Sequence, residues 1–205
     1  DASLEIIKRH KKTTHSLVNI PTKRNLIEVF NNYYFGGDPK GDWTTWQGFI
    51  KNESLLVNYE FFQQLTQIGI IWGFVSGAES ASAKFVLEQR LNLNKPPLIA
   101  MEDAPDKPNP TGFIKLANQL SGYSLGSNTP PIGYVGDTVA DVLTVKHAQK
   151  QIPQQKFISF GVAPPHLKAG KNENYRFLYE EKLRSSGADQ ILSCTFDVIH
   201  YLEKW

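Results

Sequence analysis

The sequence predicts an α/β fold, with a doubly wound parallel sheet as its core and a small helical segment before it. Short apolar runs alternate along the chain with longer stretches rich in Ala, Leu, Glu, Gln and Lys. The apolar runs lack strict polar–apolar alternation, which indicates strands that are buried on both faces. Strand and helix in repeated alternation are typical of a parallel sheet between two layers of helices.

The N-terminal part is expected to be helical. Leu4 and Ile7 have helical spacing before a basic run at residues 8–12. Cations suit a helix C-terminus, although such a run could also bind an anionic ligand. A second helix should begin after Thr22, a favourable N-cap residue, and end at the turn-forming residues 36–42.

A domain boundary is expected after these turn formers, because the pattern of the chain changes there. Trp43, Trp46 and Phe49 follow the loop closely. They could line a substrate pocket, but large aromatic side chains beside a linker more often pack between domains. We therefore divide the chain into residues 1–49 and a core of residues 50–205.

The core should contain four or five strands with helices between them. The expected strands cover residues 68–75, 97–101, 132–135, 157–160 and, as one more short strand, 188–192. The expected helices cover residues 81–91, 111–120, 139–150 and, at the C-terminal end, 195–205.

Composition argues against several classes of partner. Lys and Arg total 22 and Asp and Glu total 20, so the charge is too balanced to indicate a nucleic-acid surface. No apolar run approaches the ~20 residues of a membrane-spanning helix, and no secretory leader is recognisable. Cys194 is the only cysteine, which suits a reducing compartment. We expect a cytoplasmic protein with neither nucleic-acid nor membrane partners.

Three strands of the expected core are followed by polar residues. Ser76-Gly77 follows the first strand, Lys107 comes after the second and Asp137 follows the third, at intervals of about 30 residues, near the length of one βαβ unit. Ligands of open α/β sheets bind outside the carboxyl ends of the strands. These groups are therefore expected at one edge.

Each group also has a simpler explanation when it is taken alone. Ser76 could cap a helix, Lys107 could be an exposed turn residue, and Asp137 and Asp141 could lie in a loop and on a helix surface. Together they fit a magnesium phosphate site. Asp137 and Asp141 offer oxygen ligands, Ser76 and the Gly77 N–H would hold phosphoryl oxygens, and Lys107 would offset their charge.

The order of these groups along the chain discriminates between families. A phosphoacceptor receiver domain has its acidic pair first and its lysine last, whereas here serine comes first and the acidic pair last. This order resembles the haloacid dehalogenase superfamily. The resemblance covers roughly residues 50–205, and its second, third and fourth motifs would be Phe-Val-Ser-Gly at 74–77, Lys-Pro-Asn-Pro at 107–110 and Tyr-Val-Gly-Asp-Thr-Val-Ala-Asp at 134–141.

A finer likeness is to capped subfamily IA, in particular a group found in cyanobacteria, from residues 43–49, 52–56 and 99–103. The resemblance implies that residues 1–49 are the later part of a helical cap, and that Asp137 and Asp141 bind Mg²⁺ together with a nucleophilic aspartate. It implies hydrolysis of a small phosphorylated metabolite through an aspartyl-phosphate intermediate, with Ser76, Gly77 and Lys107 binding the phosphoryl group.

The superfamily's first motif, a strand that ends in Asp-x-Asp, is not found in this sequence. Asp38 and Asp42 lie in a Gly-rich loop without a preceding strand, and Glu102-Asp103 leads into the lysine motif. The chain opens on Asp1 and its single methionine is Met101, so we expect an upstream segment.

In the family the missing strand lies in the middle of the sheet. Its absence would leave two rows of unpaired backbone groups, which that segment or another chain would fill. The 205 residues alone are expected to be inactive. The main alternative is a noncatalytic phosphate-binding or protein-interaction module on a degenerate scaffold. A nucleotide-binding protein is disfavoured, because neither G-x-G-x-x-G nor G-x-x-x-x-G-K-[ST] occurs.

Overall fold

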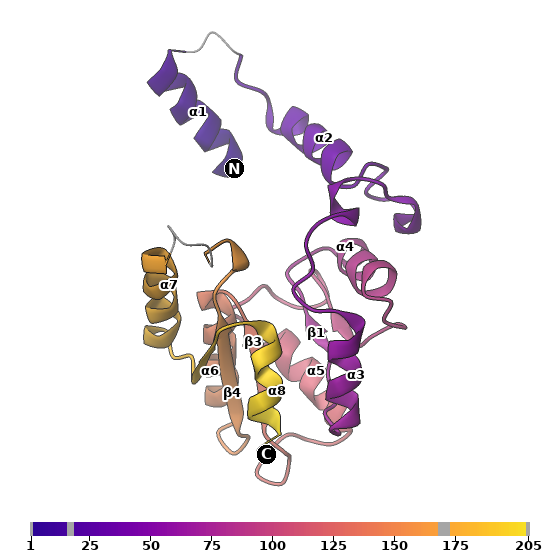
Figure 1. The fold of residues 1–205 in the computed structure, drawn as a ribbon, viewed down its shortest axis with the longest axis vertical. Helices are drawn as coiled ribbons and strands as arrows, with labels where there is room; N and C mark the ends of the chain where they lie inside the picture. Colours follow the sequence, from indigo (N-terminus) through magenta and orange to yellow (C-terminus); the bar gives the residue numbers. More distant parts are fainter. Residues whose placement is uncertain (1, 16–18, 168–172, 204–205) are drawn as a thin grey trace. The chain divides into compact units, whose positions relative to one another are not determined.

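The computed structural model describes residues 2–15, 19–167 and 173–203. The chain forms two compact units, Asp1–Ser54 and Leu55–Trp205, which we describe separately (Figure 1). Residue 1 and residues 204–205 at the end of the expected C-terminal helix lie outside the described residues.

The first unit is helical. Its elements are α1 (Ala2–Thr14), α2 (Lys23–Tyr34) and two short 3₁₀ turns, Trp43–Thr45 and Phe49–Lys51. The predicted cap at Thr22 is confirmed: its side chain accepts a hydrogen bond from the Asn25 N–H, and the Asn25 side chain accepts one from the Thr22 N–H, both at 3.2 Å. Reciprocal capping of this kind satisfies N–H groups that the first helical turn leaves free.

Trp46, one of the three aromatic residues after the loop, packs within the first unit. Trp46 is 1% exposed, its ring centroid lies 4.3 Å from that of Phe35, and its indole N–H donates to the Asp38 carbonyl at 2.9 Å. A Cβ added at Gly48 would lie 2.4 Å from the Tyr34 carbonyl oxygen, so only glycine allows this close approach. Trp46 is therefore a core residue of the first unit.

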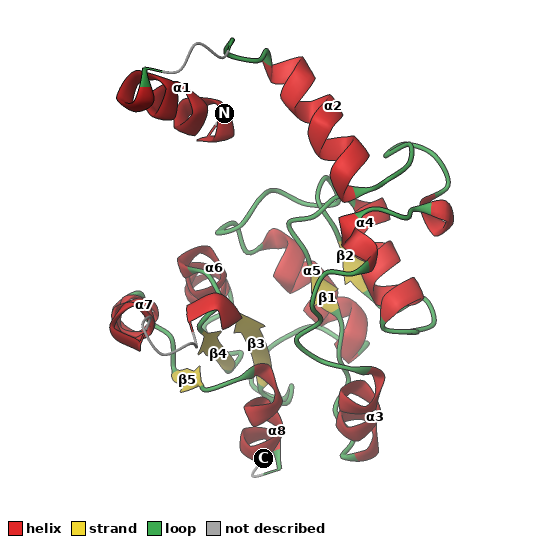
Figure 2. Ribbon diagram, turned by 45° about the horizontal axis from the view of Figure 1, so that its top comes forward, coloured by secondary structure: helices red, strands yellow, loops and turns green. Residues whose placement is uncertain are grey.

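The second unit confirms the predicted fold class, a mixed α/β fold with parallel strands, but its strands form two sheets. Strands β1 (Phe74–Val75) and β2 (Leu98–Ile99) make one sheet. The other sheet has the order β3 (Ile132–Gly136), β4 (Phe157–Val162) and β5 (Gln190–Leu192). All pairs are parallel among the described residues. Figure 2 shows β1 and β3 as the inner strands of the row.

The expected strands at 68–75 and 97–101 are longer than the observed ones. Ile68 ends helix α3 (Tyr59–Gln67), and Gly69 follows with a φ of +80°. Only Phe74 and Val75 pair with β2, and no other strand among the described residues pairs with β1. An apolar run forms a long strand only where a neighbour is available to bond its backbone.

The helices alternate with the strands as predicted, with two additions. The expected stretches at 81–91, 111–120 and 139–150 correspond to α4 (Ser80–Lys84) with a π-helical continuation (Phe85–Arg90), α5 (Thr111–Ser121) and α6 (Val139–Gln151). Residues 195–202 form a 3₁₀ turn (Thr195–Asp197) and α8 (Val198–Leu202). Helices α3 and α7 (Glu173–Ser185) were not predicted, and a further 3₁₀ turn covers Pro165–Leu167.

Two apolar clusters cover opposite faces of the strands. The α3–α8 cluster packs Phe62 of α3 and Val198 of α8 with Phe160 of β4. The α5–α6 cluster packs Phe113 of α5 and Val145 of α6 with Phe157 of β4, and the partly buried Val75, Ile132 and Tyr134 pack against it. Both clusters include residues of both sheets, so the two sheets belong to one layered unit.

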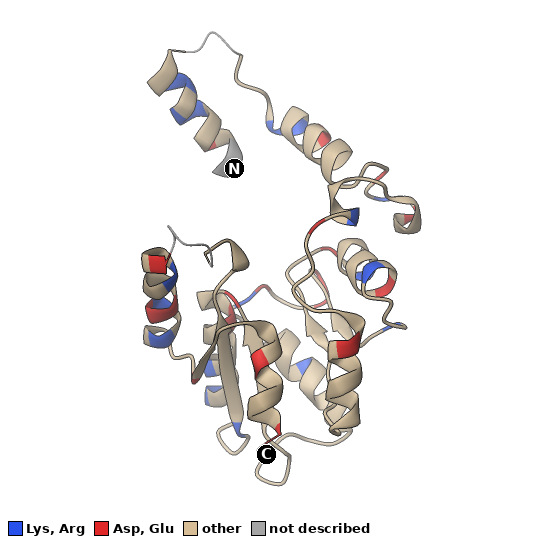
Figure 3. Cartoon of the chain, in the orientation of Figure 1, with Lys and Arg blue, Asp and Glu red and all other residues tan. Residues whose placement is uncertain are grey.

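Charges of both signs are interspersed on the helices (Figure 3). Arg24 and Glu28 form an ion pair of 3.0 Å on α2, and Arg176 and Glu180 form one of 2.7 Å on α7. In the part of the chain that the structure describes, no helix is both long and apolar enough to cross a bilayer.

Candidate active site

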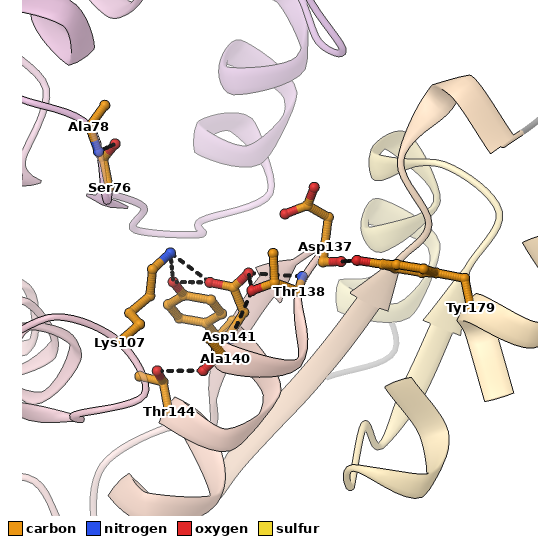
Figure 4. Close-up of polar contacts among 10 residues, drawn as sticks. Ser76, Ala78, Lys107, Asp137, Thr138, Ala140, Asp141, Thr144 and Tyr179 are labelled. Carbon is orange, nitrogen blue, oxygen red and sulfur yellow. Dashed lines mark hydrogen bonds and ion pairs between the residues drawn. The ribbon is translucent and has the colours of Figure 1, made fainter. Parts of the chain in front are cut away.

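Ser76, Lys107, Asp137 and Asp141 lie at the carboxyl ends of the strands, with Ser76 following β1 and Asp137 following β3 (Figure 4). This is the edge at which the sequence placed them. Lys107 and Asp141 are in direct contact, whereas Figure 4 shows no hydrogen bond or ion pair between Ser76 and the other three residues. Their roles in binding a ligand stay predictions.

An ion pair between Lys107 and Asp141 forms the centre of the site. The Lys107 Nζ lies 2.6 Å from Asp141 Oδ1 and donates to the Tyr134 hydroxyl at 3.3 Å. The Tyr134 hydroxyl in turn donates to the same Asp141 oxygen at 3.1 Å. Asp141 is 4% exposed, so this contact is largely protected from water.

Helix α6 supplies the other partners of Asp141. Thr138 donates to Asp141 Oδ2 from its hydroxyl at 2.6 Å and from its backbone N–H at 3.0 Å. The Asp141 N–H donates back to the Thr138 hydroxyl at 3.2 Å, which closes a capping box. Both carboxylate oxygens of Asp141 are therefore occupied by partners from the chain itself.

These contacts shift the pKa values of the site. Burial opposes ionisation of Asp141, but hydrogen bonds from Lys107 and Thr138 outweigh it and lower the pKa of the carboxyl group. Burial, followed by the charge of Asp141, raises the pKa of Tyr134. The ion pair is thus charged, and the tyrosine is a neutral donor.

Asp137 is the accessible carboxylate of the pair. Its side chain carries no interaction in Figure 4, whereas its backbone carbonyl accepts a 2.7 Å hydrogen bond from the Tyr179 hydroxyl of α7. Loss of hydration and then the charge of Asp141 raise the pKa of Asp137, against the opposing effects of Lys107 and His166. A cation bound nearby would therefore favour the ionised form of Asp137.

The phosphate-binding geometry at Ser76 differs from the expected one. Ser76 lies next to β2, because its N–H donates to the Ile99 carbonyl at 2.8 Å, and its hydroxyl accepts from the Ala78 N–H at 3.0 Å. Helix α4 begins only at Ser80, so Ser76 does not open it. The serine stabilises a turn, and a Cβ added at Gly77 would meet no atom within 4 Å.

The donor set fits a Mg²⁺ ion in part. Mg²⁺ keeps several water ligands and is often bound by one or two carboxylates. Asp137 is available, and Asp141 lies beside it with its oxygens already hydrogen-bonded. Among residues 2–15, 19–167 and 173–203 no group of three His, Cys, Asp or Glu side chains could hold a metal. The site thus offers the Asp137 carboxylate as a direct metal ligand. The Asp141 carboxylate, which Lys107 and Thr138 already bond, lies beside it in support.

Three contributors were missed from the sequence. The Thr138 to Asp141 spacing is a capping-box signal and could have been recognised. Tyr134 was part of a quoted motif without an assigned role. Tyr179 carries no signal, since it is far from Asp137 along the chain. In addition, the His147 Nδ1 lies 2.8 Å from the carbonyl oxygen of Pro108, which ties the Lys107 loop to α6.

Fold and site define a parallel α/β protein with a polar, charged site at the carboxyl ends of its strands. No family model matches the sequence, and no curated protein matches it. Two solved structures share the fold. One, a phosphonoacetaldehyde hydrolase-like protein from Oleispira antarctica, is 17% identical, with a TM-score of 0.58 over 98% of this chain and 76% of that chain.

The second structure, Northeast Structural Genomics Consortium target ZR25, was solved by X-ray diffraction. It is 16% identical with a TM-score of 0.58, over 88% of this chain and 53% of that chain. Identities this low show a shared fold alone. The chain thus shares the α/β fold of these two structures, and the haloacid dehalogenase superfamily, its subfamily and the cyanobacterial grouping stay predictions.

Proposed function

We propose that this chain is the larger part of a Mg²⁺-dependent phosphatase-type hydrolase that acts on a small phosphorylated metabolite. The ion pair between Lys107 and Asp141 beside the accessible carboxylate of Asp137 carries the proposal. An ammonium and a cation-binding carboxylate, next to each other at the ends of parallel strands, suit a phosphoryl dianion. A hydrolase-like neighbour of the same fold supports the reaction class.

Each residue has a distinct part in this proposal. Asp137 would bind Mg²⁺, which when bound would withdraw charge from the phosphoryl oxygens. Asp141 holds the ammonium of Lys107 in place, so that its charge faces the phosphoryl group. Ser76 and the Gly77 N–H would hold the remaining oxygens. Tyr179 fixes the backbone of Asp137.

The nucleophile of an aspartyl-phosphate mechanism would be supplied from outside the 205 residues. The purified chain should therefore bind Mg²⁺ and inorganic phosphate but should not hydrolyse a generic phosphate ester. NMR titration tests the binding: Mg²⁺ should shift amides at residues 136–141, and phosphate should shift those at 76–78.

Two variants provide controls for this titration. Asp137→Asn should abolish the Mg²⁺ response, and Lys107→Met should weaken phosphate binding while Mg²⁺ still binds. Absence of both responses in the unmodified chain would refute the proposal. Sustained hydrolysis that Asp137→Asn abolishes would show instead that the chain contains a nucleophile after all.

A noncatalytic phosphate-binding or protein-interaction module is the second candidate. It is favoured because no group of three His, Cys, Asp or Glu side chains that could hold a metal is found among the described residues. Phosphate binding without turnover, even after a strand ending in Asp-x-Asp has been supplied, would support it. The predicted substrate class, the predicted cap role of residues 1–49 and the cytoplasmic location stay predictions.

A further inference from the structure

The loop that carries Lys107, residues 106–110, is fastened to helix α6 at two points. The Lys107 Nζ donates to Asp141 Oδ1 at 2.6 Å, and the carbonyl oxygen of Pro108 lies 2.8 Å from Nδ1 of His147. Among the described residues, the other hydrogen bonds of this loop join it only to itself and to the first turn of α5. Positions 141 and 147 are about 9 Å apart along the helix, at 1.5 Å per residue. The loop is therefore held at two separate heights on α6.

The contact at Pro108 requires a particular form of the His147 ring. A carbonyl oxygen accepts hydrogen bonds and cannot donate them. Nδ1 of His147 must therefore carry a proton, which the ring donates to the Pro108 carbonyl. Helix α6 itself is anchored through its buried residues Val145 and Ala148, which belong to the α5–α6 cluster. His147 thus gives the loop a donor on a fixed support.

The ion pair alone does not fix the direction in which the Lys107 ammonium points. Two of its three protons go to Asp141 Oδ1 at 2.6 Å and to the Tyr134 hydroxyl at 3.3 Å (Figure 4). The third remains for a ligand. The lysine side chain is flexible, so it could keep the bond to Asp141 from several backbone positions, with the third proton pointing differently in each. Holding the loop backbone removes this freedom.

We propose that His147 is a positioning residue of the site: its bond to the Pro108 carbonyl fixes the backbone from which Lys107 extends, and so directs the ammonium towards a phosphoryl group. His147 acts through Lys107 and does not touch the ligand. The effect on phosphate rests on the proposed function. The proton on Nδ1 and the restraint of the Lys107 ammonium do not depend on it.

Two substitutions separate the hydrogen bond of His147 from the volume of its side chain. His147→Asn keeps an N–H donor bonded to Cγ, as Nδ1 is, whereas His147→Leu fills similar space without a donor. Gln149→Leu is the matched control on the same helix. The Gln149 Nε2 donates to the carbonyl oxygens of Pro153 at 3.1 Å and Gln155 at 2.9 Å, away from the Lys107 loop. A general effect of losing a side-chain bond on α6 should appear in both Leu variants.

NMR of the 205-residue chain tests the restraint without phosphate. Long-range ¹H–¹⁵N spectra identify which ring nitrogens of His147 carry protons, and a proton on Nδ1 is expected. Exchange of the Lys107 ammonium protons with water should be about 10-fold faster in His147→Leu, because the loop opens more often. In His147→Asn and Gln149→Leu it should stay within about 2-fold of the unmodified chain.

Titration with inorganic phosphate, followed by the amide shifts at residues 76–78, tests the consequence for the site. His147→Leu should weaken binding about 10-fold through misplacement of the ammonium, whereas His147→Asn and Gln149→Leu should bind within about 2-fold of the unmodified chain. In a Lys107→Met background, His147→Leu should have no further effect, because a positioning residue acts only through the group that it positions.

A bare Nδ1, unchanged phosphate affinity in His147→Leu, or an equal loss in Gln149→Leu would overturn the proposal. So would a further loss from His147→Leu once Lys107 has been replaced. If ammonium exchange changes as expected but phosphate does not bind even to the unmodified chain, the hydrolase proposal fails while the restraint of Lys107 by His147 stands. Circular dichroism checks that each variant folds. His147→Gln, whose amide lies one bond further from the helix, replaces His147→Leu if the latter is unfolded.

Discussion

Replacing Lys107 by Met tests whether the ion pair with Asp141 organises the second unit. The Asp141 side chain is 5% exposed and the Lys107 side chain 25% exposed, so removal of the ammonium leaves a carboxylate with little access to water. Removing one partner of a buried pair typically costs 3–5 kcal/mol. Thr138 still donates to Asp141, so we expect the low end of that range, about 3 kcal/mol.

Urea unfolding followed by far-UV circular dichroism measures this loss. Lys146→Met is the matched control, since Lys146 pairs with Asp189 at 2.9 Å but the two side chains are 34% and 39% exposed. Exposed pairs contribute roughly 0–1 kcal/mol. The double variant Lys107→Met with Asp141→Asn should recover part of the loss, because no buried charge remains. If Lys107→Met destabilises the chain no more than Lys146→Met, the reasoning is refuted.

Three further variants test the loop around Asp137. Gly136→Ala places a Cβ 2.3 Å from the Cβ of Asp141 and should destabilise the protein by about 1–3 kcal/mol, seen as a lower urea midpoint; an unchanged midpoint would contradict this contact. Thr138→Ala removes the N-cap side chain of α6 and should lower the free energy of unfolding by about 1 kcal/mol, whereas Thr138→Ser keeps the capping hydroxyl and should stay close to the unmodified protein. Tyr179→Phe removes the 2.7 Å bond to the Asp137 carbonyl and should lower stability by about 1 kcal/mol. It should also weaken Mg²⁺ binding in the NMR titration; wild-type affinity would show that Tyr179 does not position Asp137.

The sequence was most informative where local rules apply. Thr22 caps α2 as predicted because capping depends on groups three residues apart. The alternation of strands and helices predicted the fold class, because burial on both faces imposes apolar runs. The interpretation of Ser76 as a helix cap was wrong, because its hydroxyl accepts from the Ala78 N–H in a turn that precedes α4, whereas the start of α4 at Ser80 is close to the expected residue 81.

Strand length could not be predicted from apolarity alone. Residues 68–73 are apolar enough for a strand, but they form the turn after α3 and a segment before Phe74 that pairs with no strand among the described residues. A strand needs hydrogen-bonding neighbours, and those come from distant parts of the chain. Helix α7 was missed for a different reason. Its apolar side chains Tyr175, Phe177 and Leu178 are exposed, so the sequence shows no clear separation of an apolar and a polar helix face.

By itself, the sequence determined which polar groups follow which strands, because chain order and parallel topology bring those ends to one edge. Only the tertiary structure decided how they pair. It placed Lys107 2.6 Å from Asp141, buried Tyr134 beside both, and brought Tyr179 of α7 to the Asp137 carbonyl. It also divided the sheet between β1 and β3. Such contacts join residues far apart in sequence, so packing of the whole unit, rather than any local pattern, selects them.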